Sequence, residues 1–101
     1  MLLGRILKHI RIFNHYTQIE VAERLNLSPS YISEIETDKK VPTIEVLQNY
    51  SSIFDIPLSS ILLFAEEYND KDKLRKKMRG FLTKTAIGFL DWICKEDEKR
   101  A

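Results

Sequence analysis

Apolar side chains recur along the chain at intervals of three and four residues, the spacing that places them on one face of an α-helix. The first such series predicts a helix over about residues 2–13 and consists of Leu3, Leu7, Ile10 and Phe13. Signals for β-strands are weak, and only three prolines and three glycines interrupt the helical pattern. The pattern therefore predicts an all-α fold.

Residues that can cap a helix mark where further helices begin, because a side-chain oxygen there can accept a hydrogen bond from a free N–H group of the first turn. Thr17 is followed by Glu20 at the spacing of a capping box, and Pro29 stands where a helix tolerates its missing N–H group. The predicted helices are residues 18–25 after Thr17, residues 29–36 after Ser28 and residues 44–54 after Thr43. A fifth helix is predicted after the turn at residues 55–57.

Two short helices that meet at a tight corner, with helices before and after them, have the layout of a DNA-binding helix-turn-helix. The residue order is more specific than the layout. T-Q-x-E-x-A at residues 17–22 and S-x-x-Y-I-S-x-I-E at residues 28–36 resemble the Cro and lambda-repressor-like family, also called the XRE family. The resemblance covers about residues 3–64, includes Gly4 and Arg11, and implies a five-helix lambda-repressor-like helix-turn-helix domain, which we place at residues 1–66.

The first turn of the third predicted helix is polar, whereas its apolar residues come later. A recognition helix enters the major groove with its N-terminal end first, so small polar side chains there can pair with base edges. The family resemblance implies base contacts from the same turn and from the residue one turn later. The candidate base-reading residues are Pro29, Ser30, Tyr31, Ser33 and Glu34. The alternatives that Tyr31 only packs and that Glu34 only faces solvent stay open at this point.

Candidates for contact with DNA phosphates flank this helix. Free N–H groups and a carboxamide at a helix N-terminus can hold a phosphate, and the resemblance implies that role for Gln18. The candidate phosphate-contacting residues are Gln18, Thr17, Ser28, Lys39 and Lys40. The best-supported role of Ser28 is the helix cap, and a pair of loop lysines is also a common solubilising feature.

The predicted DNA-binding domain is not basic. Residues 1–66 carry six basic and eight acidic residues, whereas six of the nine residues from Lys71 to Arg79 are basic. Because non-specific DNA binding depends on cationic contacts to phosphate, the domain alone is expected to bind DNA weakly. The basic run is a candidate source of the missing cations.

Residues 67–101 are predicted to form an additional C-terminal helix with one apolar face, which must be buried. The face can pack on its own domain, pair with a second copy, or lie on a membrane surface, the least favoured reading. We expect a homodimer, because one recognition helix touches only a few base pairs. Pairing of two tails would also leave Lys71–Arg79 near the DNA-binding units. The candidate dimerisation residues are Leu74, Met78, Phe81, Leu82, Phe89, Trp92 and Ile93.

Together these patterns predict a sequence-specific transcriptional regulator, chiefly a dimeric repressor that binds an inverted-repeat operator in double-stranded DNA. One alternative is an antitoxin or restriction-modification controller of the same fold, either of which could have a protein partner. Another is a protein-interaction module that has lost DNA binding, which the acidic balance of residues 1–66 favours.

An enzyme is not predicted, since the chain has no recognisable nucleophile–base pair, paired carboxylates or phosphate-binding glycine loop. No metal or other cofactor is expected, because His9 and His15 lack partners at ligand spacing. The single cysteine, Cys94, and the lack of a signal peptide or a long apolar run indicate a cytoplasmic protein.

Overall fold

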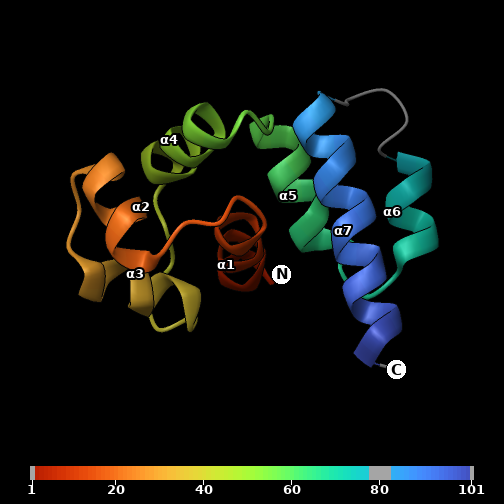
Figure 1. Cartoon of the computed structure of the whole chain (residues 1–101), viewed down its shortest axis with the longest axis horizontal. Helices are drawn as coiled ribbons and strands as arrows, with labels where there is room; N and C mark the ends of the chain where they lie inside the picture. The colour runs from red at the N-terminus through yellow and green to blue at the C-terminus, as the bar shows by residue number, and fades with distance from the viewer. Residues whose placement is uncertain (1, 78–82, 101) are drawn as a thin grey trace.

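The computed structural model describes residues 2–77 and 83–100, with the side chains of the last helix described as far as Lys95. Within these ranges the chain is helical and contains no strand, so the predicted all-α class is confirmed. The helices are α1 (Leu3–Phe13), α2 (Gln18–Leu25), α3 (Pro29–Glu36), α4 (Ile44–Phe54), α5 (Leu58–Glu66), α6 (Lys71–Lys77) and α7 (Lys84–Arg100). Figure 1 shows α1 at the centre, with α2, α3 and α4 on one side and α5, α6 and α7 on the other.

Side-chain caps start α2, α3 and α4 where the sequence predicts them. Thr17 Oγ1 accepts from the Glu20 N–H group at 3.1 Å, and Glu20 Oε1 accepts from the Thr17 N–H group at 3.0 Å, which completes the capping box. These hydrogen bonds hold the pKa of the Glu20 carboxyl below its usual value. Ser28 Oγ and Thr43 Oγ1 cap α3 and α4 in the same way, each at 3.1 Å.

The corners between the helices are made by residues with left-handed backbone conformations. Four of the described residues other than glycine have positive φ angles: His15 at 62°, Asn26 at 57°, Asp38 at 60° and Asp55 at 53°. Asn26 ends α2 and Asp55 ends α4. Asn and Asp tolerate this conformation better than most residues. The connections from α2 to α3 and from α4 to α5, which begin at Asn26 and Asp55, are therefore only three residues long.

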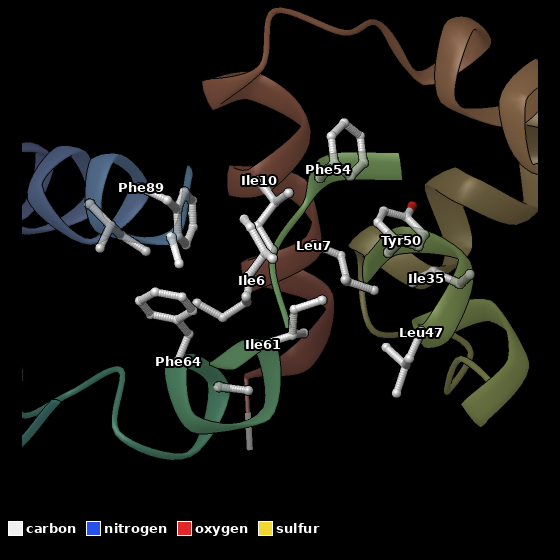
Figure 2. Close-up of a cluster of buried hydrophobic side chains, with 14 of the residues drawn as sticks. Ile6, Leu7, Ile10, Ile35, Leu47, Tyr50, Phe54, Ile61, Phe64 and Phe89 are labelled. Atoms are coloured by element: carbon white, nitrogen blue, oxygen red, sulfur yellow. The ribbon is translucent and has the colours of Figure 1, made fainter. Parts of the chain in front are cut away.

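A single hydrophobic core surrounds α1. Its side chains Ile6, Leu7 and Ile10 are fully buried. Figure 2 shows Tyr50 of α4 on one side of this helix and Phe64 of α5 on the other. The helix-turn-helix side and the C-terminal side of the chain therefore share one core through α1.

α1 approaches the end of α3 so closely that only glycine fits at position 4. A Cβ atom added at Gly4 would lie 2.2 Å from the backbone oxygen of Ile35 and 2.5 Å from Asp38 Oδ1. Gly4→Ala is expected to lower the free energy of unfolding by about 1–3 kcal/mol, because the two helices must separate. Denaturant unfolding followed by circular dichroism measures the loss.

Gly88→Ala is the matched control for this prediction. A Cβ atom there would lie 3.3 Å from Phe13 Cζ, the far end of a side chain that can shift, and alanine favours a helix interior by about 1 kcal/mol. We expect little change or a small gain in stability. Equal losses for the two variants would contradict the close approach at Gly4.

The C-terminal segment differs from the single helix predicted for it. It contains two helices, and α7 has its own N-terminal cap, since Thr83 Oγ1 accepts from the Ala86 N–H group at 3.1 Å. The Thr83 hydroxyl also donates to the backbone oxygen of Asp55 at 2.9 Å, which fixes the start of α7 beside the end of α4. The described residues thus form two helices where we predicted one additional C-terminal helix.

The described part of the apolar face of the C-terminal segment packs on its own domain. Leu74, Phe89 and Ile93 are at most 1% exposed, and Figure 2 shows Phe89 pointing toward the core cluster. Contacts within the chain bury these three side chains, which favours the alternative that the face packs on its own domain over pairing with a second copy. Trp92 is partly exposed and packs against Phe13 of α1, with ring centroids 5.6 Å apart. Met78, Phe81 and Leu82, also predicted to pair, lie outside the described residues.

The basic helix α6 lies at the opposite end of the long axis from α2 and α3 (Figure 1). The expected position of residues 71–77 near α2 and α3, the helices predicted to bind DNA, is therefore not found within one chain. Two of its lysines instead form ion pairs within the C-terminal half: Lys77 Nζ lies 2.6 Å and Lys73 Nζ 3.7 Å from Glu67 Oε1. The hydrogen bond from Lys77 lowers the pKa of the Glu67 carboxyl.

No helix in the described part of the chain is long and apolar enough to cross a membrane. Among the same residues, no group of three or more His, Cys, Asp or Glu side chains could hold a metal ion. Cys94 is buried, and this burial raises the pKa of its thiol.

Candidate nucleic-acid interface

The polar face of α3 points away from the core. Ile32 and Ile35 are fully buried and fix which side of the helix faces inward. The candidate base-reading residues lie on the remaining surface, where Pro29 and Ser30 are exposed and the partly exposed ones are Tyr31, Ser33 and Glu34. One short helix therefore presents all five candidates together.

The candidate phosphate contacts surround this surface. Thr17 and Ser28 are exposed at the N-terminal caps of α2 and α3, and the two lysines after α3 are exposed as well. Gln18 is partly exposed, and its Nε2 donates to Glu36 Oε1 at 3.0 Å. This hydrogen bond sets the orientation of the Gln18 carboxamide at the first turn of α2.

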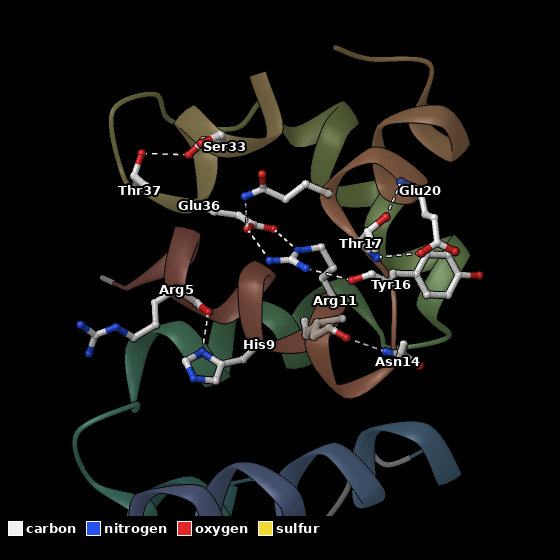
Figure 3. A network of polar contacts seen from close by, with 12 residues as sticks. Arg5, His9, Arg11, Asn14, Tyr16, Thr17, Glu20, Ser33, Glu36 and Thr37 are labelled. Carbon is white, nitrogen blue, oxygen red and sulfur yellow. Dashed lines mark hydrogen bonds and ion pairs between the residues drawn. The ribbon is translucent and has the colours of Figure 1, made fainter. Parts of the chain in front are cut away.

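A buried ion pair beneath the interface was not predicted from the sequence. Arg11 Nε donates to Glu36 Oε2 at 2.7 Å, and Arg11 Nη2 donates to Glu36 Oε1 at 3.0 Å, so the pair is bidentate. Arg11 Nη1 also donates to the backbone oxygen of Tyr16 at 2.9 Å (Figure 3). The two charged side chains are 11% and 1% exposed respectively. The pair joins α1 to the last turn of α3.

The cluster of Arg11, Glu36 and Gln18 holds three helices in fixed relation, because these residues come from α1, α3 and α2.

Among the described residues, the buried Tyr50 hydroxyl has no hydrogen-bond partner. Burial, and secondarily the Glu36 carboxylate, raise the pKa of Tyr50 far above its usual value. The sequence held one signal for the buried ion pair. Glu36 lies four residues after Ile32 and so on the inner face of α3, where a buried acidic residue needs a partner.

The chain after α3 folds back along the same surface. The N–H groups of Lys39 and Lys40 both donate to the backbone oxygen of Glu34, at 2.9 and 3.2 Å. Lys40 Nζ lies 3.3 Å from Glu34 Oε2 and 5.6 Å from the centre of the Tyr31 ring. A cation thus stands beside two of the candidate base readers.

Comparison with known proteins identifies the family to which this helix arrangement belongs. Residues 7–61 of the 101 match the family model described as helix-turn-helix. The chain belongs to the XRE family of helix-turn-helix proteins. The matched region contains α2, α3 and α4 in full, together with most of α1.

Curated relatives of this XRE-family chain are named as repressors and transcriptional regulators. The immunity repressor protein of Bacillus phage phi105 is 35% identical over 80 residues, covering 72% of this chain and 56% of its own length. The HTH-type transcriptional regulator ImmR of Bacillus subtilis is 32% identical over 77 residues, covering 76% of this chain and 55% of its own length. The transcriptional regulator ClgR of Mycobacterium tuberculosis is 34% identical over 65 residues, covering 64% and 58%.

This XRE-family chain thus spans just over half the length of the relatives that it matches. No solved structure matches the chain significantly.

Proposed function

We propose that the protein is a sequence-specific transcriptional regulator that binds an inverted-repeat operator as a dimeric repressor. The exposed polar face of α3, backed by the buried Arg11–Glu36 pair, carries this proposal. Such a helix can enter the major groove, and a rigid support sets its depth and angle. The names of the relatives support the same function.

The proposed dimer needs a surface other than the buried face of α7. The most exposed large apolar side chains among the described residues are Val41, 85% exposed, and Ile44, 61% exposed. Val41 lies in the loop after α3 and Ile44 is the first residue of α4, so contact between two copies there would keep the two recognition helices close together. We assign the dimer contact to this region.

Selection of bound DNA from a random pool tests the proposal. We expect an inverted repeat whose half-site centres lie about 10 base pairs apart, one turn of DNA, because two symmetric recognition helices must reach the same face of the duplex.

Ser30→Ala should alter the preferred base at one position of each half-site. Lys39→Ala should weaken binding to all sequences alike and make the salt dependence shallower.

The chief alternative is a protein-interaction module without DNA binding, which the excess of acidic residues in residues 1–66 and the remote position of α6 favour. Failure to enrich any motif at low salt would support this alternative and contradict the repressor. A single, non-repeated motif would leave DNA reading intact and contradict the dimer.

A further inference from the structure

The backbone ties Lys40 to the recognition helix. Asp38, with a φ angle of 60°, reverses the chain after α3, and the Lys40 N–H group then donates to the backbone oxygen of Glu34 at 3.2 Å. The main chain of Lys40 is therefore anchored to the residue whose side chain is the last candidate base reader. A lysine on a free loop would have no such anchor.

From this anchored position, the Lys40 side chain extends back over the candidate base-reading residues of α3. Its ammonium group lies 3.3 Å from Glu34 Oε2 and 5.6 Å from the centre of the Tyr31 ring. The carboxylate and the negative face of the ring both attract a cation at this position. The two side chains of the ion pair are 54% and 36% exposed, so the pair is open to a ligand.

The ion pair does little for folding but matters on DNA. Exposed ion pairs contribute little to stability in water, so a substitution at Lys40 should leave the fold intact. A lone Glu34 carboxylate in the major groove would be repelled by the flanking phosphates. With Lys40 beside it, the carboxylate can approach the base edges without adding net negative charge.

The pair presents an acceptor and a donor side by side. In the major groove a C·G pair presents the cytosine N4 donor next to the guanine O6 acceptor, about 2.9 Å apart because these atoms share a hydrogen bond. Glu34 Oε2 and Lys40 Nζ, 3.3 Å apart, match these two groups in spacing and in polarity. An A·T pair also presents a donor beside an acceptor, adenine N6 and thymine O4. It suits the ion pair less well, because the N7 acceptor lies on the other side of N6 and faces the carboxylate, and the thymine methyl group lies beside O4, where guanine offers the ammonium group a second acceptor in N7.

We propose that Lys40 is a specificity-determining residue that, together with Glu34, reads one C·G base pair in each half-site. Glu34 accepts from cytosine N4, Lys40 donates to guanine O6, and the Tyr31 ring supports the ammonium group. This inference rests on the proposed function. It differs from the sequence-based expectation, which named Lys40 together with Lys39 as a candidate phosphate contact.

Selection and binding titrations with the full chain and four variants test the inference. Glu34→Gln should identify the position and change its preference from C·G to A·T, because glutamine pairs with adenine N6 and N7. Lys40→Ala should reduce the preference for C·G at that same position about tenfold. Lys40→Arg keeps a cationic donor and should retain the preference.

Lys39→Ala is the matched control, since Lys39 is an exposed neighbour whose side chain makes no ion pair or ring contact with any described residue. It should lower affinity for every sequence by the same factor. The inference is overturned if Lys40→Ala gives the same uniform loss, or if Glu34→Gln changes no preference for C·G. A wild-type chain that enriches no motif at all would overturn the proposed function together with this inference.

Discussion

Glu36→Ala is expected to lower the free energy of unfolding by about 3–5 kcal/mol, the typical loss when one partner of a buried ion pair is removed. The substitution leaves the Arg11 guanidinium, only 11% exposed, without the carboxylate that accepts its Nε and Nη2 hydrogen bonds. It also removes the acceptor of the Gln18 carboxamide. Leaving the Arg11 charge unpaired in a poorly solvated site costs more free energy than is gained by no longer burying the Glu36 carboxylate.

Denaturant unfolding monitored by circular dichroism measures this loss. Glu23→Ala is the control, because Glu23 is an exposed glutamate of α2 and should change stability by no more than about 0.5 kcal/mol. Replacing both Arg11 and Glu36 by methionine should lower the free energy of unfolding by less than the sum of the losses for Arg11→Met and Glu36→Met. The double variant leaves no unpaired buried charge, whereas each single variant leaves one. A loss below about 1 kcal/mol for Glu36→Ala would contradict the structural role of the pair.

Phe89→Ala is expected to lower the free energy of unfolding by a similar amount, about 3–5 kcal/mol. The Phe89 ring is fully buried, with its centre 4.8 Å from that of Phe64 and 5.6 Å from that of Phe13. Alanine would leave a cavity where α7 meets α1 and α5. Ile87→Ala, on the same helix but 43% exposed, is the control and should cost far less.

Protein concentration separates packing within one chain from pairing between chains. Because Phe89 packs within its own chain, the loss of stability in Phe89→Ala should be the same in dilute and concentrated solution. Pairing of two tails would instead make the loss depend on protein concentration, since the contact would then form only on association. A concentration-dependent loss would restore the dimerisation role first expected for this face.

The helix boundaries were predictable because the signals that set them are local. Thr17, Ser28 and Thr43 each lie three residues before the N–H group that they cap, so the sequence alone contains both partners. The polar first turn of α3 was predictable for a similar reason. Its outward face follows from the spacing of Ile32 and Ile35, which are buried.

Contacts between distant residues were not predictable in this way. Arg11 and Glu36 are 25 positions apart, and each also reads as an ordinary surface charge until the fold brings them together. The apolar spacing of the C-terminal segment predicts that a face is buried, but it does not say whether the same chain or another copy buries it. The separate start of α7 depends on Thr83, whose capping signal the apolar pattern obscured.

The left-handed corner at Asn26 has a consequence for the thermodynamics of recognition. Glycine would populate this backbone conformation and many others, whereas asparagine, held at a φ angle of 57°, has fewer accessible states. In the proposed complex with DNA, α2 and α3 would therefore act as one preorganised unit rather than as two helices that must first be ordered. The conformational entropy of the corner is lost when the chain folds, so none of it is subtracted from the affinity for DNA.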